Sequence, residues 1–419
     1  MPINADENKS SECVGVHPSP KRRRVIVKIV VLGGAGLMGR IAVKDLAASK
    51  GVDQVVIADR DTELAQKVAN LIPEGRSKVS VVYTDVTEHG GLVATLNGAD
   101  AVLNAVHYYF NLNVMRACLE AKTHYTDMGG LFYNTRKQLK LHDEFAQAGL
   151  TAVLGMGSAP GVPNVQARYA ADRLETIEYI RIYDGILPPP GDDIRFGYAI
   201  PTIIDELVMP PMVFRDGEFV AEEPLAGEED YWFTPPVGLL RCHLSLHSEV
   251  ATLPVTFEGK GIRECFFKIN YWGMSPEAFA KVKLLADLGF TGDEPVDVRG
   301  RPVKPRDVLT TLLADYIPAL HAFVEESVDP ARWTKEIVTE VKGTQDGKEL
   351  VYRLGTLTSV GSLPTGVAPS IAAQWLAAGR ISGSGVFPAE VAIDPQPFFD
   401  ELARRGIVTR VSVTESVSS

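Results

Sequence analysis

The stretch 25–40, "VIVKIVVLGGAGLMGR", decides the fold of this chain. It opens with a nearly continuous β-branched run at 25–32, as expected for a strand that is covered on both faces. Gly34, Gly36 and Gly39 then stand in GxGxxG register at the start of a helical pattern. In such a motif the first glycine permits a tight turn, the second admits a pyrophosphate, and the third lets helix pack closely on strand. The stretch therefore predicts a dinucleotide-binding loop.

An acidic residue at the expected distance strengthens this prediction. The next predicted strand, 54–58, is followed by Asp59, which lies 20 residues after Gly39, where a carboxylate accepts hydrogen bonds from the adenosine ribose. Asp59 would repel a 2′-phosphate, which favours NAD, whereas Arg60 could neutralise that phosphate, as in NADP-binding proteins. NAD is predicted as the cofactor, with NADP as the alternative.

The strand and helix patterns continue to alternate along the chain. Further strands are predicted at 79–84, 99–106, 123–130 and 151–157. This alternation is typical of a doubly wound parallel sheet, whose ligands bind outside the carboxyl ends of the strands. Asp85 and Val86 are therefore expected near the adenine, and Asn104 and Ala105 near the nicotinamide ribose. For Asp85, capping of a turn is an equally good interpretation.

The pattern changes after residue 160, where segments with alternating polarity predict an α+β domain with a mixed or antiparallel sheet. One hairpin is expected to close at Asp346-Gly347, because this dipeptide suits a tight hairpin turn. The expected division of the chain is a disordered tail (1–24), a Rossmann domain (25–160), a substrate-binding and dimerisation domain (161–355), C-terminal helices that return to the Rossmann domain (356–410), and a second tail (411–419).

Composition excludes several classes of protein. The formal net charge of −11 argues against nucleic-acid binding, because such proteins gather Lys and Arg. The four cysteines are widely spaced without a CxxC pair, which indicates a reducing compartment. The N-terminal segment has no apolar run that could act as a secretory signal, and no segment approaches the ~20 apolar residues that span a bilayer. The sequence predicts a cytoplasmic protein without a membrane or nucleic-acid partner.

The segment 239–254, "LLRCHLSLHSEVATLP", carries the most polar chemistry outside the first domain. Its two histidines are four residues apart, but the helical zinc motif requires a glutamate where Leu244 stands. Alternating leucines and a β-branched end predict a strand instead. One face of this strand would carry Arg241, His243, Ser245, His247 and Glu249. That face could contact a substrate, be merely hydrated, or bind a metal; no metal is predicted, because nicotinamide chemistry needs none.

A substrate-facing strand suggests oxidation of an amine. The nitrogen must lose a proton before hydride leaves the adjacent carbon, and a histidine titrates in the right range. We predict that His247 is the general base, that Glu249 contacts the substrate amine, and that Arg241 binds a substrate carboxylate through two hydrogen bonds. His243 shares the same predicted face.

Three residues of the first domain are further candidates, because they follow predicted strands at the expected nicotinamide position. Asp127 could stabilise a cationic iminium, with helix capping as the alternative. Tyr125 would lie beside it as a substrate contact. Ser158 is expected in the loop beneath the nicotinamide.

The chain contains four longer strings of high specificity: "YYFNLNVMRACLEAKTHYTDMGG" (108–130), "GMGSAPGVPNVQARYAAD" (155–172), "LHSEVATLP" (246–254) and "PTGVAPSIAAQWLAAGRISGSGVFPAE" (364–390). Together they resemble the saccharopine dehydrogenase superfamily, and within it the lysine 6-dehydrogenase-like branch. The resemblance implies a Rossmann domain, an inserted substrate domain, and a homodimer or larger homo-oligomer. It also implies oxidoreduction at a carbon–nitrogen bond of an amino acid.

The resemblance further implies roles for individual residues. The cofactor contacts it implies are Ala35, Gly36, Leu37, Met38, Asp59, Arg60, Asp85, Val86 and Asn104. Substrate contacts are implied at Tyr108 and Asp127, and by local context at Arg241. The predicted reaction is NAD-dependent oxidative deamination of L-lysine to its 6-semialdehyde with release of ammonia. The alternatives are a saccharopine-type or carboxynorspermidine-type reductase acting on amino-acid or polyamine substrates, and a nucleotide-sensing regulator without turnover.

Overall fold

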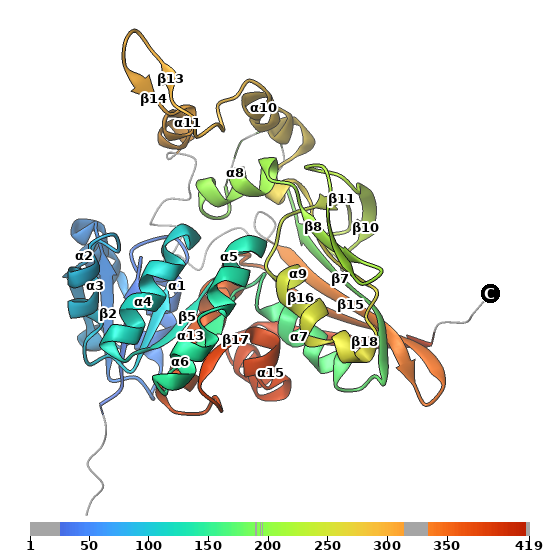
Figure 1. The fold of residues 1–419 in the computed structure, drawn as a ribbon, viewed down its shortest axis with the longest axis horizontal. Coiled ribbons are helices and arrows are strands. Elements are labelled where there is room, and N and C mark those ends of the chain that lie inside the picture. Colours follow the sequence, from blue (N-terminus) through green and yellow to red (C-terminus); the bar gives the residue numbers. More distant parts are fainter. Residues whose placement is uncertain (1–25, 189–190, 193, 195, 314–333, 416–419) are drawn as a thin grey trace, which may run out of the picture.

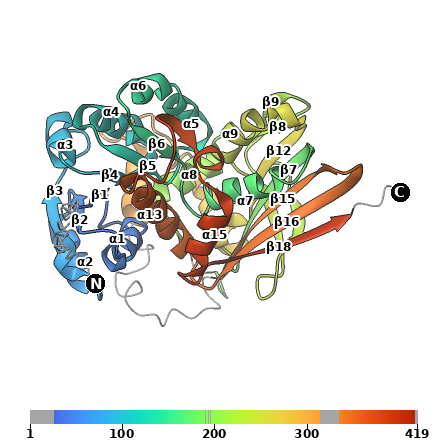
Figure 2. The same cartoon turned by 90° about the horizontal axis from the view of Figure 1, so that it is seen from below.

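The computed structural model describes residues 26–188, 191–192, 194, 196–313 and 334–415, so the predicted tail 1–24 lies outside the described residues. Two sheets organise the fold and lie side by side (Figures 1 and 2). Within the described ranges, no helix is long and apolar enough to cross a membrane.

The first sheet has seven parallel strands in the order β17-β6-β5-β4-β1-β2-β3. They are β1 (Lys28–Leu32), β2 (Gln54–Asp59), β3 (Val79–Tyr83), β4 (Ala101–Asn104), β5 (His124–Asp127), β6 (Thr151–Leu154) and β17 (Gly385–Pro388). The first six strands have the order 3-2-1-4-5-6 of a doubly wound dinucleotide-binding sheet, which confirms the predicted Rossmann fold. The seventh, β17, is added from the C-terminal part of the chain.

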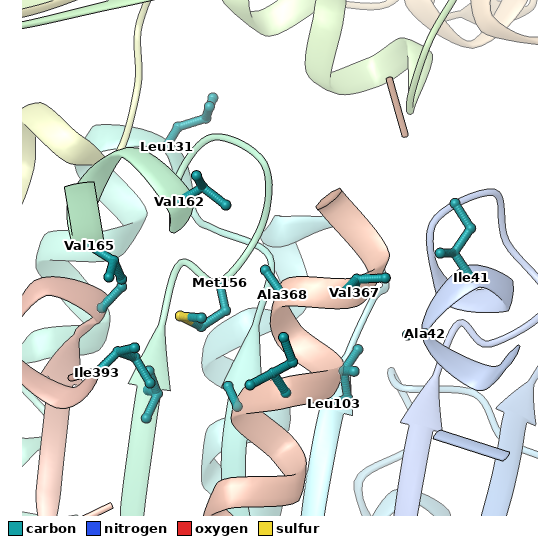
Figure 3. Packing of buried hydrophobic residues seen from close by; sticks show 14 of the residues in the cluster. Ile41, Ala42, Leu103, Leu131, Met156, Val162, Val165, Val367, Ala368 and Ile393 are labelled. Carbon is teal, nitrogen blue, oxygen red and sulfur yellow. The ribbon is translucent and has the colours of Figure 1, made fainter. Parts of the chain in front are cut away.

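Helices cover both faces of this sheet. They are α1 (Gly39–Ala48), α2 (Thr62–Leu71), α3 (His89–Leu96), α4 (Asn111–Ala121), α5 (Leu131–Leu139), α6 (His142–Gln147) and α13 (Leu363–Ala377). On one face, α3, α4 and α6 contribute to an apolar layer that includes Phe145. On the other face, α13 packs beside α1 and against β4 and β5. Figure 3 shows Val367 and Ala368 of α13 near Leu103 of β4.

The second sheet has nine strands and is mixed, as predicted. Its main path is β10-β11-β12-β7-β15-β16-β18, and β8 pairs with both β12 and β9. The strands are β7 (Thr176–Ile186), β8 (Met212–Arg215), β9 (Glu218–Ala221), β10 (Glu229–Trp232), β11 (Leu239–Leu244), β12 (Glu264–Ile269), β15 (Lys335–Gln345), β16 (Lys348–Thr358) and β18 (Val408–Glu415). Only β12 and β7 run parallel among the described pairs.

The predicted hairpin closes at Asp346 and Gly347, whose φ angles are 52° and 74°. The positive angle at both turn positions explains why an Asp-Gly pair stands here. The resulting β15–β16 pair forms the long ribbon that reaches away from the parallel sheet (Figure 2).

Further helices fill the space between and around the two sheets. They are α7 (Val162–Ala171), α8 (Ile200–Val208), α9 (Glu249–Thr256), α14 (Ala389–Ala392) and α15 (Pro395–Ala403). A lobe at the top of Figure 1 consists of α10 (Pro276–Asp287), β13 (Val296–Asp297), β14 (Pro302–Val303) and α11 (Pro305–Leu313). Among these elements, α9 packs on α5 and on β12, so it joins the two halves of the molecule.

Two predictions of secondary structure are wrong. The predicted strand 239–254 ends at Leu244, and α9 occupies the second half of the segment, so its polar residues do not share one strand face. Residues 411–415, expected in a tail, form most of β18, which pairs with β16 through eight residue pairs from Leu350–Glu415 to Leu357–Val408. Both outcomes depend on partners that are distant in sequence.

Candidate active site

The glycine loop joins β1 to α1 through a very close approach of the two backbones. Gly33 has a φ of 69°, so the left-handed turn lies one residue before the predicted Gly34. A Cβ on Gly39 would overlap the carbonyl oxygen of Gly33. Beside Gly36, that same carbonyl oxygen is the only described atom, apart from Gly36 and its two chain neighbours, within 4 Å of where a Cβ would be. The loop therefore leaves one side open to a ligand that must approach the backbone.

Hydrogen bonds in the loop show which groups could hold a dinucleotide. The N–H of Gly36 donates to the carbonyl of Gly33 at 3.0 Å, and the N–H of Ala35 donates to Asp59 at 3.1 Å. The amides of Leu37 and Met38, directly before α1, donate to no acceptor in the described part of the chain. Free amides at a helix N-terminus suit the pyrophosphate of NAD(P). The residues present therefore fit the predicted cofactor.

Asp59 ends β2 beside the glycine loop. Both oxygens of Asp59 accept backbone N–H groups, from Ala35 and from Asp61, and this fixes the carboxylate beside the loop. Arg60 is largely exposed and lies 4.0 Å from Asp85. Asp85 accepts hydrogen bonds from the N–H and the hydroxyl of Thr87, so its side chain caps a turn. Turn capping was the alternative to a position near the adenine. Val86 next to it is half-buried.

A buried network lies below the carboxyl ends of β4 and β5. Oδ2 of Asp127 accepts hydrogen bonds from Tyr125, Asn111 and Gln138, and Oδ1 accepts the N–H groups of Gly129 and Gly155. Asn104 donates to Asn111 and Tyr125. Asp127 and Tyr125 are at most 1% exposed. Burial raises the pKa of Asp127, although these hydrogen bonds oppose the shift.

This network corrects three predictions. Asp127 and Tyr125 have no free surface for a substrate, and five donors already use the carboxylate. They fix the turn after β5 instead of touching a reacting group. The side chain of Asn104 is also committed to the network, although its Oδ1 has no hydrogen-bond partner among the described residues. Ala105 follows β4, and its carbonyl lies against Gly33 of the glycine loop.

Tyr108 connects the parallel sheet to α8. Its hydroxyl and that of Tyr109 donate to Oδ2 of Asp205 at 2.7 and 2.6 Å. The other oxygen of Asp205 accepts from Arg306 of α11 at 2.7 Å. The Tyr108 hydroxyl, predicted to bind substrate, therefore contacts Asp205. Nearby, burial lowers the pKa of His107 to about 4, with Asp205 opposing and Arg306 adding to the shift.

His247 and Glu249 lie at the junction of the two sheets, between β11 and α9. Nδ1 of His247 is 2.6 Å from Oε2 of Glu249, and both side chains are buried. The imidazole stacks on Phe267 of β12 with ring centroids 3.7 Å apart. The adjacent Ser248 accepts hydrogen bonds from the N–H of Gly130 and the hydroxyl of Thr135. These contacts hold the pair next to the carboxyl end of β5, where ligands of a doubly wound sheet bind.

Carboxylates around His247 set its protonation. Burial lowers the pKa of His247, but the charge and hydrogen bond of Glu249, with the charges of Glu206 and Asp184, outweigh this and raise it above its ordinary value. Burial also raises the pKa values of Glu206 and Asp184, although His247 and Lys335 respectively oppose the shift. A raised pKa favours the protonated imidazole, the form that can donate a proton to a substrate.

The remaining predicted residues of 239–254 do not join this pair. Arg241 is exposed and forms an ion pair with Asp230 at 2.8 Å, because β11 pairs with β10 at that point. Its predicted contact with a substrate carboxylate is not supported. His243 is fully buried near Tyr271 and Trp272, and its Nε2 has no partner among the described residues. Ser158 is buried in the loop after β6, and its Oγ is likewise unpaired there.

Sequence reasoning missed three polar residues close to His247. Glu206 of α8 accepts from Trp272, Tyr198 and Ser245. Asp184 of β7 pairs with Lys335 of β15 at 3.0 Å. The strand pattern "IEYIRIYDG" (177–185) carries three charged residues, so no local signal distinguished Asp184 from Glu178 and Arg181. In the described ranges, no group of three or more His, Cys, Asp or Glu side chains could hold a metal ion.

A doubly wound sheet with an open glycine loop, joined to a mixed sheet at a buried histidine–carboxylate pair, defines a dinucleotide-binding protein with a second domain. Comparison with known proteins narrows this class. The family model for the saccharopine dehydrogenase NADP binding domain matches residues 29–153, and that for the saccharopine dehydrogenase C-terminal domain matches residues 157–407. The chain belongs to the saccharopine dehydrogenase family, and its cofactor is NAD(P).

Relatives cover nearly the whole chain at low identity. Carboxyaminopropylagmatine dehydrogenase of Synechocystis sp. is 25% identical over 90% of this chain and 96% of its own length. Carboxynorspermidine synthase of Vibrio cholerae is 24% identical over 91% and 96%. A solved structure of saccharopine dehydrogenase (L-Glu forming) from Saccharomyces cerevisiae superposes with a TM-score of 0.65 at 19% identity, covering 93% of this chain and all of that one. The family and fold predictions are confirmed.

Proposed function

We propose that this protein joins an aldehyde to a primary amine and reduces the resulting imine to a secondary amine that carries a carboxylate. Two relatives that align with at least 90% of the chain are named for carboxylated amines, carboxyaminopropylagmatine and carboxynorspermidine. This was an alternative in the sequence analysis. It is better supported than oxidative deamination of lysine, for which no comparable support exists among the relatives described above.

The proposed reaction has two steps, condensation and reduction. The amine and the aldehyde condense to an imine with loss of water. NAD(P)H, held by the amides of Leu37 and Met38, would supply the hydride for the imine carbon, and the imine nitrogen takes up one proton. His247 donates that proton, and Glu249 holds the imidazole in place through the 2.6 Å hydrogen bond. The carboxylates of Glu249 and Asp184 stabilise the cationic iminium before hydride arrives.

The observation that carries the proposal is the buried His247–Glu249 pair beside the carboxyl end of β5. The neighbouring carboxylates raise the pKa of His247, which favours the protonated form that an acid for imine reduction requires. The net negative charge of the surrounding carboxylates also suits an amino donor, which enters as a cation.

The test combines the purified protein with NADH or NADPH, an amino-acid semialdehyde, and a diamine or agmatine. We expect loss of NAD(P)H absorbance and a secondary amine in the mass spectrum. His247→Gln should lower kcat by about 100-fold or more. The matched control is His89→Gln, since His89 is exposed and pairs only with the surface residue Glu120; it should retain turnover.

Other outcomes identify other functions. NADH formation and ammonia release from lysine with NAD, in the absence of any condensation product, would restore the deaminase prediction. Cofactor binding without turnover for any aldehyde–amine pair or amine would support the nucleotide-sensing alternative.

A further inference from the structure

We infer that Lys335 binds the substrate carboxylate and thereby selects carboxylated substrates, with Asp184 positioning its ammonium group. The inference rests on the proposed function, because it names the group that receives the carboxylate of the secondary amine. It also replaces Arg241, whose guanidinium is exposed and paired on β11.

Strand register places Lys335 on the same sheet face as the His247 site. Ile337 of β15 pairs with Asp184, which pairs in turn with Ile269 of β12. Thr339 and Phe267 flank Ile182 in the same way, two residues along each strand. Because alternate residues of a strand face the same side, Lys335, Asp184 and Phe267 share one face. His247 stacks on Phe267 from that side.

Lys335 is the one suitable buried cation in the described part of the chain. The buried cations there are Arg40, Lys268, Arg306 and Lys335. Lys268 points to the opposite face, where it bonds Glu229 and lies over Phe266. Arg306 is held by Asp205 and the carbonyl of Thr291. Arg40 lies on α1 of the nucleotide-binding sheet.

The hydrogen bonds of the Lys335–Asp184 pair are incomplete. A lysine ammonium has three donors, and the described contact of Lys335 uses one, to Oδ2 of Asp184 at 3.0 Å. Oδ1 of Asp184 is buried and has no partner among the described residues. Buried ion pairs are stable only when their remaining hydrogen-bonding groups are satisfied. A substrate carboxylate would accept hydrogen bonds from the donors of Lys335 that its contact with Asp184 does not use.

Two aldehydes of equal chain length, one with and one without a carboxylate, test the inference. For Lys335→Met we expect the KM of the carboxylated aldehyde to rise about 10- to 100-fold. The KM of the plain aldehyde should change by less than about twofold. Lys335→Arg should restore part of the preference. The matched control is Lys342→Met on the same strand, because Lys342 pairs with Glu178 and Glu349 away from this face.

Calorimetry on the NAD(P)-loaded protein separates this inference from the proposed function. The carboxylated secondary amine should bind the wild type at least 10-fold more tightly than its analogue without the carboxylate, and Lys335→Met should abolish that difference. If the variant, shown to be folded by its thermal transition, keeps the preference, the inference is wrong. If the variant does not fold, Lys335→Gln, which also removes the charge, carries the same comparison. Absence of turnover with retained, Lys335-dependent carboxylate binding would overturn only the proposed function.

Discussion

The position of Asp59 could be predicted from the sequence, but the hydrogen bonds that hold its carboxylate could be seen only in the structure. Its spacing from Gly39 predicts a ribose contact, and two backbone N–H groups hold the carboxylate there. The choice between NAD and NADP depends on whether repulsion by the Asp59 carboxylate or attraction by the Arg60 guanidinium dominates at the position of a 2′-phosphate. The exposed Arg60 side chain leaves Asp59 as the fixed charge, which favours NAD.

Asp59→Ala should therefore change cofactor preference. We expect the KM for NADH to rise about 10-fold through loss of a charge-assisted hydrogen bond, while the KM for NADPH stays constant or falls. Steady-state kinetics with both cofactors measure this. Arg60→Ala is the companion variant, and a selective rise of its KM for NADPH would show that the protein reads the 2′-phosphate after all.

Glu249→Gln should shift the pH dependence of imine reduction. His247 must be protonated to act as an acid, so turnover falls as pH rises through its pKa. Without the Glu249 charge, less opposes the lowering of this pKa by burial, so the fall in kcat should move to lower pH. Glu258→Gln on the exposed turn after α9 is the control. An unchanged profile would remove His247 from the proton transfer.

At the scale of residues, the sequence could not predict which polar side chains are buried or which groups surround them. Asp127 and Tyr125 follow a strand at the right place, yet the folded chain surrounds them with donors from α4 and α5. Asp184, Glu206 and Lys335 are separated by many residues and meet only through sheet pairing and α8. His247 and Glu249 were predicted as site residues on one face of a strand. In the structure the strand ends at Leu244, and Glu249 begins α9.

At the scale of elements, the long strands and the glycine loop were predictable because their signals are local. The segment 249–256 was not, since its β-branched residues favour a strand and α9 forms through packing on α5 and β12. Its buried residues include Val250, Leu253 and Pro254. Packing on distant elements overrides the local preference.

The start of α1 lies so close to the turn after β1 that residue 39 has no room for a side chain. In Gly39→Ala the new Cβ meets the Gly33 carbonyl, so the start of α1 must move outward, and the free amides of Leu37 and Met38 move with it away from the expected pyrophosphate position. The expected loss of stability is about 1–3 kcal/mol, together with at least a tenfold rise in the Kd for NAD(P)H. Gly51→Ala, which meets no atom within 4 Å, is the control. Normal cofactor binding by the Gly39 variant would contradict this account of the loop.

At the scale of the whole molecule, Asp205 joins the nucleotide-binding sheet to α8 and α11. Asp205→Asn removes the charge that balances the buried Arg306 and should cost roughly 3 kcal/mol of stability. Denaturant unfolding of the variant measures this cost. Asp287→Asn breaks an exposed ion pair with Lys283 and should cost less than about 0.5 kcal/mol. Equal losses in the two variants would show that Arg306 is balanced by other groups, such as Asp293.

The seventh strand of the parallel sheet has a consequence for how the protein is made. β17 pairs with β6 through Gly385–Thr151 to Pro388–Leu154, and more than 200 residues separate the partners along the chain. A ribosome that has released β1 to β6 has produced an unfinished sheet, whose β6 edge stays open while the entire second sheet up to β16 is translated. The first unit to begin folding is thus among the last to be completed. During translation, the open edge of β6 is a place where a chaperone could bind or where two nascent chains could pair.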